Sequence, residues 1–206
     1  MKKTLLIAAA ALVAGVISSE AQVYSANIVG YVNVVTPGSS QYALIANPLD
    51  DGTNNLTDLV PSAATGSTVL VWNGASYNSS TKTPTSWSAN PHIAPGTGFF
   101  LRTAAIFTNT FVGNVAAAPG GGTVTNALAG GVYSLVGSAI PYSDNLASTN
   151  LNLVPATGST VLIFNGSGYT SSTKTPTSWS FNPVIAAGQG FFVRPTVAYS
   201  WVQTLY

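Results

Sequence analysis

The chain has no cysteine, only one histidine and one methionine, and few charged residues, which make up 5% of its 206 positions. Without cysteine it forms no disulfide framework, so its stability must come from a packed core. It also lacks the clustered lysine and arginine of nucleic-acid-binding proteins, and it contains no phosphate loop and no Gly-x-Ser-x-Gly elbow. We therefore expect no nucleic-acid partner, no cofactor and no enzymatic activity.

Residues 1–21 are organised like a signal peptide. Lys2 and Lys3 precede an apolar stretch at 4–17, and residues 19–21 fit a cleavage site. The apolar stretch is shorter than the ~20 residues that a spanning helix needs, and no later run is long enough. We expect cleavage before Gln22 and a mature protein without a transmembrane segment, either secreted or held at the cell surface.

Removal of this segment leaves a chain with no net charge. Its basic residues are then two lysines and two arginines, and its acidic residues are four aspartates. A neutral surface with so few charges provides little repulsion between copies. This composition favours self-association.

An internal duplication dominates the rest of the sequence. Residues 66–103 return as 158–195, with 27 of the 38 positions identical. Residues 42–49 align more loosely with 133–140, and the stretch at 116–123 is rich in proline and glycine. We predict a first module at 22–115 that includes an N-terminal strand, a linker at 116–123, and a second module at 124–206.

Each copy has the alternation of β-strands. The β-rich runs 67–72 and 159–164 end at Asn73-Gly74 and Asn165-Gly166, the preferred dipeptide of type I′ hairpin turns. Apolar residues with helical spacing are missing from 22–206, although 55–60 is suited to one short turn. The prediction is an all-β protein of two tandem β-sandwich or barrel-like modules with short antiparallel strands.

These residues also resemble a known kind of module. The segments Leu-Ile-Ala-Asn-Pro (44–48), Trp-Asn-Gly (72–74), Trp87 and Pro-Gly-Thr-Gly-Phe-Phe-Leu (95–101) are similar to a recurrent module of uncharacterised secreted bacterial proteins. Those proteins often begin their mature region with a stretch like 23–33. The resemblance implies export and an all-β fold and brings no known activity. The second copy departs from it at Gly137-Ser138, where Asn-Pro is expected.

Candidates for chemistry are few. His92 is the single histidine, and the second copy has Val184 in its place, which favours a structural role over a catalytic one. Asp50, Asp51 and Asp58 form the one acidic cluster. They could bind calcium through oxygen ligands, but a polar turn is the simpler interpretation, and both alternatives stay open.

Aromatic and basic residues repeated in both copies are the candidate contacts for a polysaccharide or another partner. Trp87 and Trp179 could stack on sugar rings or fill the core of their own module, and the core is favoured because large aromatics dominate small β cores. Trp72, matched by Phe164, is predicted to be core. The full candidate set is Trp87, Trp179, Tyr77, Tyr169, Lys82 and Lys174.

The N-terminal stretch is predicted to be an assembly strand. Alternate residues from Tyr24, including Ile28, Val32 and Val34, are apolar and predict one buried face. Similar stretches lie at 111–115 and 199–206, so three strands bracket two modules and one is left over to pair with a neighbouring subunit. Alternatively, the first strand could pair with the last and close its own fold.

Three function classes follow. The leading hypothesis is a secreted structural or surface-assembly protein that polymerises by strand addition. The alternative is a carbohydrate-binding module of the cell surface or extracellular matrix. An enzyme is the least favoured class, since no nucleophile, metal site or phosphate loop is visible.

Overall fold

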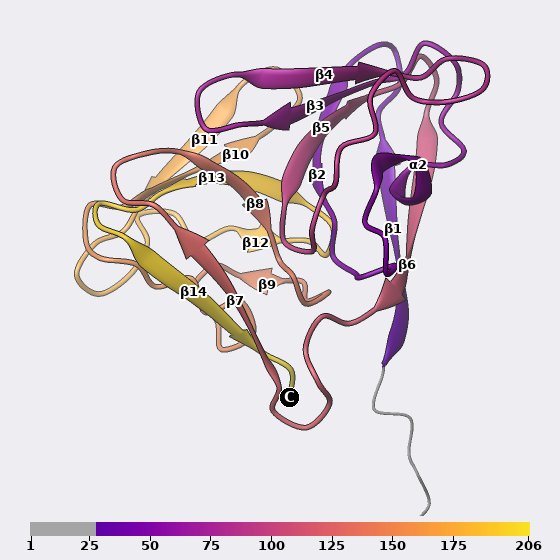
Figure 1. The fold of residues 1–206 in the computed structure, drawn as a ribbon. Coiled ribbons are helices and arrows are strands. Elements are labelled where there is room, and N and C mark those ends of the chain that lie inside the picture. Colours follow the sequence, from indigo (N-terminus) through magenta and orange to yellow (C-terminus); the bar gives the residue numbers. More distant parts are fainter. Residues whose placement is uncertain (1–27) are drawn as a thin grey trace, which may run out of the picture.

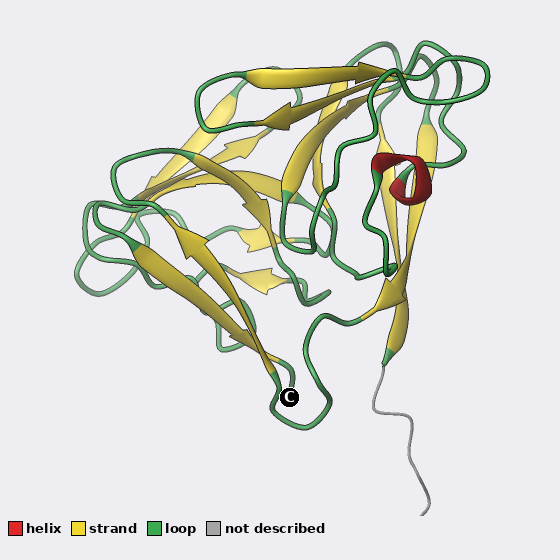
Figure 2. Ribbon diagram, in the orientation of Figure 1, coloured by secondary structure: helices red, strands yellow, loops and turns green. Residues whose placement is uncertain are grey.

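The structure is a computed structural model that describes residues 28–206 (Figure 1); residues 1–27, with the predicted signal peptide and Tyr24, lie outside the described part. Within that range the regular elements are β-strands and one short helix, α2 (Leu56–Leu59) (Figure 2). The all-β prediction is confirmed. The helix lies inside the stretch 55–60, for which one short turn was predicted.

The strands divide into two sets with similar order. The first half contains β1 (Val29–Thr36), β2 (Tyr42–Ala46), β3 (Thr68–Trp72), β4 (Tyr77–Thr81), β5 (Gly98–Arg102) and β6 (Phe107–Asn114). The second half contains β7 (Thr123–Leu128), β8 (Ser134–Gly137), β9 (Asp144–Asn145), β10 (Thr160–Phe164), β11 (Tyr169–Thr173), β12 (Val184–Ile185), β13 (Gly190–Arg194) and β14 (Tyr199–Thr204). Strand β7 begins at Thr123, the last residue of the predicted linker.

Each half contains one antiparallel four-stranded sheet. The order is β2-β5-β3-β4 in the first half and β8-β13-β10-β11 in the second, so equivalent strands occupy equivalent places. Trp72 pairs with Tyr77 and Phe164 pairs with Tyr169 at the ends of the two hairpins. The duplicated sequence therefore folds twice into the same sheet.

The hairpin turns differ from the type I′ prediction. Four residues, 73–76, connect β3 to β4, and Asn73 is not among the residues with positive φ, whereas Gly74 has a φ of 100°. The Asn73 side-chain oxygen accepts hydrogen bonds from the N–H groups of Ala75 and Ser76, at 3.0 and 2.8 Å. This side chain stabilises a longer turn, a role for which Asn is as well suited as for type I′.

A two-stranded ribbon completes each half. Strand β1 pairs with β6 from Val29–Asn114 to Thr36–Phe107, and β7 pairs with β14 from Thr123–Thr204 to Leu128–Tyr199. Every strand within residues 28–206 has a partner in the same chain, so the described part contains no leftover strand. The first strand thus closes its own half, but not with the partner that the closure alternative predicted: β1 pairs with β6, and the last strand, β14, pairs with β7.

The core of each half lies between its sheet and its ribbon. In the first half, the inward side chains of β1 and β6 pack with those of β5, including Phe99, Leu101 and Phe111. In the second half, Phe191, Val193 and Trp201 take part in the corresponding cluster. Val32 and Val34 contact the first core, in agreement with the predicted buried face of the N-terminal strand.

The two halves meet through reciprocal contacts. The Ala46 N–H donates to the Gly188 carbonyl at 2.8 Å, and the equivalent Gly137 N–H donates to the Gly96 carbonyl at 3.0 Å. A third hydrophobic cluster fills this junction, and its buried members form two equivalent pairs, Leu44 with Leu135 and Phe100 with Phe192. The junction therefore has the self-complementary pattern of an interface with approximate two-fold symmetry.

Candidate functional site

Trp87 and Trp179 lie in the cores of their halves. They are 5% and 4% exposed, and their indole N–H groups donate to the carbonyls of Val60 at 3.3 Å and Leu153 at 3.1 Å. No open ring face is left to stack on a sugar. The structure thus corrects the stacking interpretation and supports the core alternative, because burying a large aromatic ring stabilises a small β core.

The two lysines serve the loops that carry them. The Lys174 ammonium donates to its neighbour's carbonyl, Thr175 O, at 2.7 Å, and the residue is only 9% exposed. Lys82 contacts the Pro61 carbonyl at 3.4 Å and lies 5.6 Å from the centre of the Trp87 ring. These contacts within the protein are a structural reason for the identity of the two loop sequences. They also leave Lys174 little exposed surface for binding a partner.

Tyr77 and Tyr169 come together at the junction between the halves. They are 39% and 44% exposed and line one open pocket of about 170 Å³ with Trp72, Tyr133, Leu162 and Phe192. Trp72 is half-buried here and donates its indole N–H to the Tyr133 carbonyl at 3.0 Å, so it belongs to the junction and not to the core of its own half. We call this surface the aromatic strip.

The aromatic strip is rigidly packed. The Tyr77 ring lies 4.9 Å from Trp72 and 5.7 Å from Phe100, and the Tyr169 ring lies 5.4 Å from Phe164 and 5.9 Å from Phe192. Most of these pairs adopt edge-to-face or tilted geometry, which aromatic quadrupoles favour. The strip thus offers partly exposed rings and two phenol groups held in fixed positions.

The stability of the protein should fall at high pH because of Tyr77. Burial, then the charge of Tyr169, then a hydrogen bond with it raise the pKa of Tyr77 to about 12. An unfolded tyrosine has a pKa of about 10, so stability is fully present below pH 10 and is lost as the pH rises towards 12. Urea unfolding at successive pH values should show this loss, and Tyr77→Phe should show a smaller one. A titration of Tyr77 near pH 10 would contradict the prediction.

The predicted assembly strand is β1, and its exposed side is more apolar than expected. Val32 and Val34 face the core, but the predicted burial of Ile28 is wrong: it lies before the first residue of β1 and is exposed. Tyr31 and Val35 point outward at 74% and 61% exposure. Val112, opposite Tyr31 on β6, is 57% exposed. The sequence prediction missed these three residues because it followed the buried face; the alternate positions of the same run were the available signal.

The ribbon of the second half provides an internal comparison. Tyr31 pairs with Val112 in the first ribbon, and the equivalent pair in the second ribbon is Thr123 with Thr204. Val35 is likewise matched by Ala127. These equivalent positions therefore carry exposed apolar side chains in the first ribbon and polar or small side chains in the second. We call Tyr31, Val35 and Val112 the outer face of the first ribbon.

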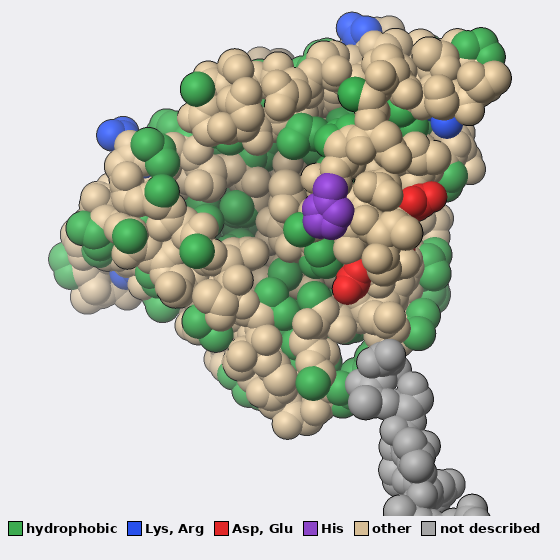
Figure 3. Space-filling model, viewed as in Figure 1, with side chains coloured by type: hydrophobic (Ala, Val, Ile, Leu, Met, Phe, Trp, Pro, Cys, Tyr) green, Lys and Arg blue, Asp and Glu red, His purple; other side chains and the backbone are tan. Residues whose placement is uncertain are grey.

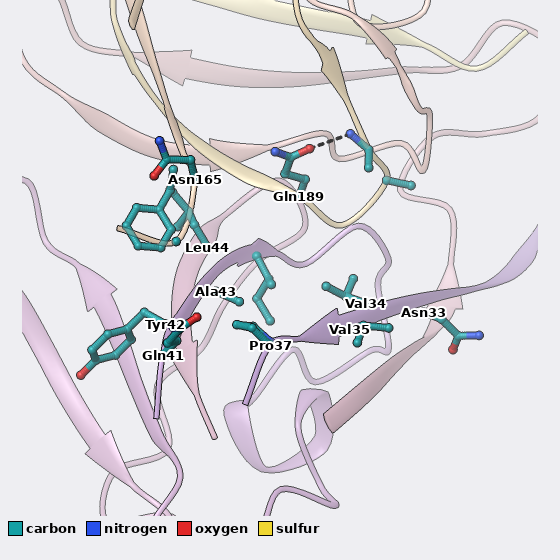
Figure 4. A pocket seen from close by; sticks show the side chains of 15 residues that line it. Asn33, Val34, Val35, Pro37, Gln41, Tyr42, Ala43, Leu44, Asn165 and Gln189 are labelled. Carbon is teal, nitrogen blue, oxygen red and sulfur yellow. Dashed lines mark hydrogen bonds between the residues drawn. The ribbon is translucent and has the colours of Figure 1, made fainter. Parts of the chain in front are cut away.

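A cleft of about 460 Å³ borders the last part of β1, and Val35 of the outer face is among its lining residues (Figure 4). One wall is the stretch from Asn33 to Pro37, the floor includes Ala43 and Ile45 of β2, and the opposite wall contains Asn165 and Gln189 of the second half. No Asp, Glu, Lys, Arg or His residue lines the cleft. The cleft therefore suits an uncharged ligand or chain segment.

His92 and the aspartates have structural surroundings. His92 is exposed (Figure 3) and forms a backbone bridge with Asn55, as Val184 does with Asn145. Asp51 accepts hydrogen bonds from Thr53 and Asn54. Among residues 28–206 no group of three or more potential metal ligands is found. The acidic cluster thus has the hydrogen bonds of a polar turn.

The structure places the departure from the Asn-Pro pattern at Ser138-Ala139 and not at Gly137-Ser138, because Gly137 pairs with Gly190 as Ala46 pairs with Gly98. A substitution elsewhere in the second half compensates for it. Asn47 is fully buried and donates to Asn54 and to the Ile93 carbonyl at 3.0 and 2.8 Å. In the second half, Gln203 instead donates to Ser138 at 2.7 Å and accepts the Ala139 N–H at 2.9 Å. A distant side chain thus replaces the missing amide. Sequence alignment gave no signal for it, because Gln203 is matched by Phe111.

In the part of the chain that the structure describes, no helix is long and apolar enough to cross a membrane. The comparisons with known proteins add no relative. No protein-family model matches the chain, and no curated protein or solved structure matches it.

Proposed function

We propose that this protein is a secreted structural protein whose copies associate through the first ribbon. The observation that carries the proposal is the contrast between the two ribbons, since exposed Tyr31, Val35 and Val112 occupy positions that are threonine or alanine in the second half. An exposed apolar patch with a polar surrounding is typical of a protein contact. The second ribbon forms without apolar side chains at these positions, so the fold of a ribbon does not require them.

The charge distribution supports association of like copies. Figure 3 shows a surface composed mainly of uncharged polar and apolar groups, with isolated charged side chains. After removal of residues 1–21 the net charge is zero, so two copies approach without net electrostatic repulsion. A second copy of this chain is therefore the partner that we propose for the outer face.

The outer face is tested by giving it the residues of the second ribbon. The variant Tyr31→Thr/Val112→Thr should keep the fold and weaken self-association by about tenfold or more, because each lost apolar contact removes on the order of 1 kcal/mol. Val35 is kept because it also lines the cleft. Light scattering over a concentration series of residues 22–206 measures the change.

The matched control is Val184→His. It removes an apolar side chain of comparable exposure and introduces the residue that the first half has at the equivalent position. Association should be unchanged in this variant. If residues 22–206 remain monomeric at high concentration, the proposed function is wrong.

Carbohydrate binding is the second candidate function, and the aromatic strip favours it. The strip offers the partly exposed rings of Tyr77 and Tyr169 and their two phenol groups at a neutral surface. Aromatic rings pack well against the C–H faces of sugars. Lys82 lies outside this strip, and the two core tryptophans are no longer part of the candidate.

Tyr77→Ala/Tyr169→Ala tests the carbohydrate hypothesis. The double variant should reduce retention on insoluble cellulose or chitin by about tenfold, because two stacking contacts together contribute on the order of 1 to 3 kcal/mol. Tyr31→Thr removes an exposed tyrosine elsewhere and serves as the control. Equal retention of all three proteins would exclude the strip as a sugar site.

A further inference from the structure

The edge of β1 that faces away from β6 is open within residues 28–206. Asn114 exchanges backbone hydrogen bonds with Asp50, at 2.7 and 2.8 Å, so its N–H and C=O groups point away from β1. Its partner Val29 is therefore at a non-hydrogen-bonded position, and such positions alternate along an antiparallel pair. The backbone groups of Tyr31, Asn33 and Val35 consequently point away from β6, and no hydrogen bond within the described range satisfies them.

Asn33 and Val35 of this open edge line one wall of the 460 Å³ cleft, and two fixed amides lie on the opposite wall. The Gln189 side-chain oxygen accepts the Ala186 N–H at 3.0 Å, and the Asn165 oxygen accepts the N–H groups of Ser167 and Gly168. These bonds orient both side chains and leave their NH₂ groups without partners among residues 28–206. Figure 4 shows the Gln189 nitrogen on the side away from the hydrogen bond that the Gln189 oxygen accepts, and Asn165 lies on that same side.

An extended polypeptide segment fits this arrangement. Its backbone on one side would pair with the β1 edge, as in strand addition, and its carbonyls on the other side would accept from the two NH₂ groups. The edge from Tyr31 to Val35 is about 14 Å long at ~3.4 Å per residue, so a segment of five or six residues covers it. A segment without charges is required, since nothing charged lines the cleft.

We propose that the cleft receives residues 22–27 of a second copy, so that copies are joined by strand addition. This inference rests on the proposed function and names the site of contact. The segment Gln-Val-Tyr-Ser-Ala-Asn is uncharged and alternates, with Tyr24 and Ala26 on one side. It directly precedes the described chain, which begins at Ile28.

The position of the cleft favours a neighbouring copy over the chain's own segment. The cleft lies along Asn33 to Pro37, at the end of β1 opposite to Val29. The preceding residues would have to reverse direction to reach their own cleft, whereas a second copy needs no reversal. Strand β1 stays paired with β6 throughout, so the donor is the segment before β1 and not the strand itself.

Two measurements test the inference. Residues 28–206 should fold with an unchanged circular dichroism spectrum but associate at least tenfold more weakly than residues 22–206. The acetylated, amidated peptide of residues 22–27 should bind residues 28–206 in a one-to-one ratio by calorimetry. A peptide with alternate backbone amides N-methylated should bind at least tenfold more weakly, because it cannot pair with an edge.

Isosteric changes test the opposite wall. Asn165→Asp/Gln189→Glu keeps the two oxygens that fix the side chains and removes both NH₂ groups, so peptide binding should fall at least tenfold. Asn73→Asp, the equivalent change in the first hairpin, lies outside the cleft and should bind as the unchanged chain does.

The outcomes separate the two proposals. If residues 28–206 associate as strongly as residues 22–206 while the outer-face variant does not, the inference is wrong and the proposed function stands. If residues 22–206 are monomeric, the proposed function fails. Binding of cellohexaose in the cleft without binding of the peptide would replace the segment with a carbohydrate and overturn the inference.

Discussion

Trp87→Ala and Trp179→Ala are each expected to lower the free energy of unfolding by about 3 to 5 kcal/mol, the range for truncating a buried aromatic residue. Both rings are nearly inaccessible and belong to the hydrophobic clusters of their halves. Each change also leaves a buried carbonyl, that of Val60 or Leu153, without its indole donor, which adds a desolvation cost.

Urea unfolding followed by circular dichroism measures this loss. Trp→Phe at either position should cost less, because most of the apolar volume is kept and only the hydrogen bond and part of the ring are lost. Tyr31→Ala truncates a ring that is 74% exposed and provides an aromatic control of small effect. A change of less than about 1 kcal/mol for Trp→Ala would mean that the rings do not fill the cores, and the stacking interpretation would return.

The strands were predictable because local pattern determines them. Alternation and the repeated segments identified β3, β4, β10 and β11, and the apolar positions Val32 and Val34 do face the core. Pairing of the terminal strands was not predictable. Closure within a half and donation to a neighbour satisfy the same backbone groups, so the sequence leaves their energies nearly equal.

The junction between the halves could not be located from alternation alone. In β5 the consecutive residues Phe99, Phe100 and Leu101 are all buried, with Phe99 and Leu101 in the core and Phe100 in the junction. A run that is apolar on both faces indicates a strand covered on both sides. Both copies contain such a run. The run does not indicate, however, that the other half of the chain covers the second face of the strand.

The site was predicted only in part. Repetition in both copies indicates Tyr77 and Tyr169 as contact residues, and the structure brings them into one pocket. The same pattern indicates Trp87 and Trp179, which are buried, because repetition reflects folding as well as function. The sequence indicates only a turn at Asn165 and gives no signal for Gln189, since the packing of the two halves places both of them opposite β1.

Gly137→Ala is expected to destabilise the protein by about 1 to 3 kcal/mol, the usual cost of overpacking. A Cβ atom at this position would collide with the Cβ of Ala46 and lie 2.8 Å from the Gln189 carbonyl oxygen. Gly137 and Ala46 are equivalent positions that meet across the junction. Because they approach so closely, only one of the two can carry a methyl group.

Exchanging the residues at the two positions tests whether their Cβ atoms collide. Ala46→Gly alone should cost about 0.5 to 1 kcal/mol through backbone entropy. Added to Gly137→Ala, it should recover part of the lost stability instead of costing more, because it removes the collision; the contact with Gln189 remains and limits the recovery. A double-mutant cycle from urea unfolding should therefore give a coupling of about 0.5 kcal/mol or more. If the two changes add within about 0.3 kcal/mol, the halves do not meet at these residues, and the reciprocal junction that places Asn165 and Gln189 opposite β1 would be lost with them.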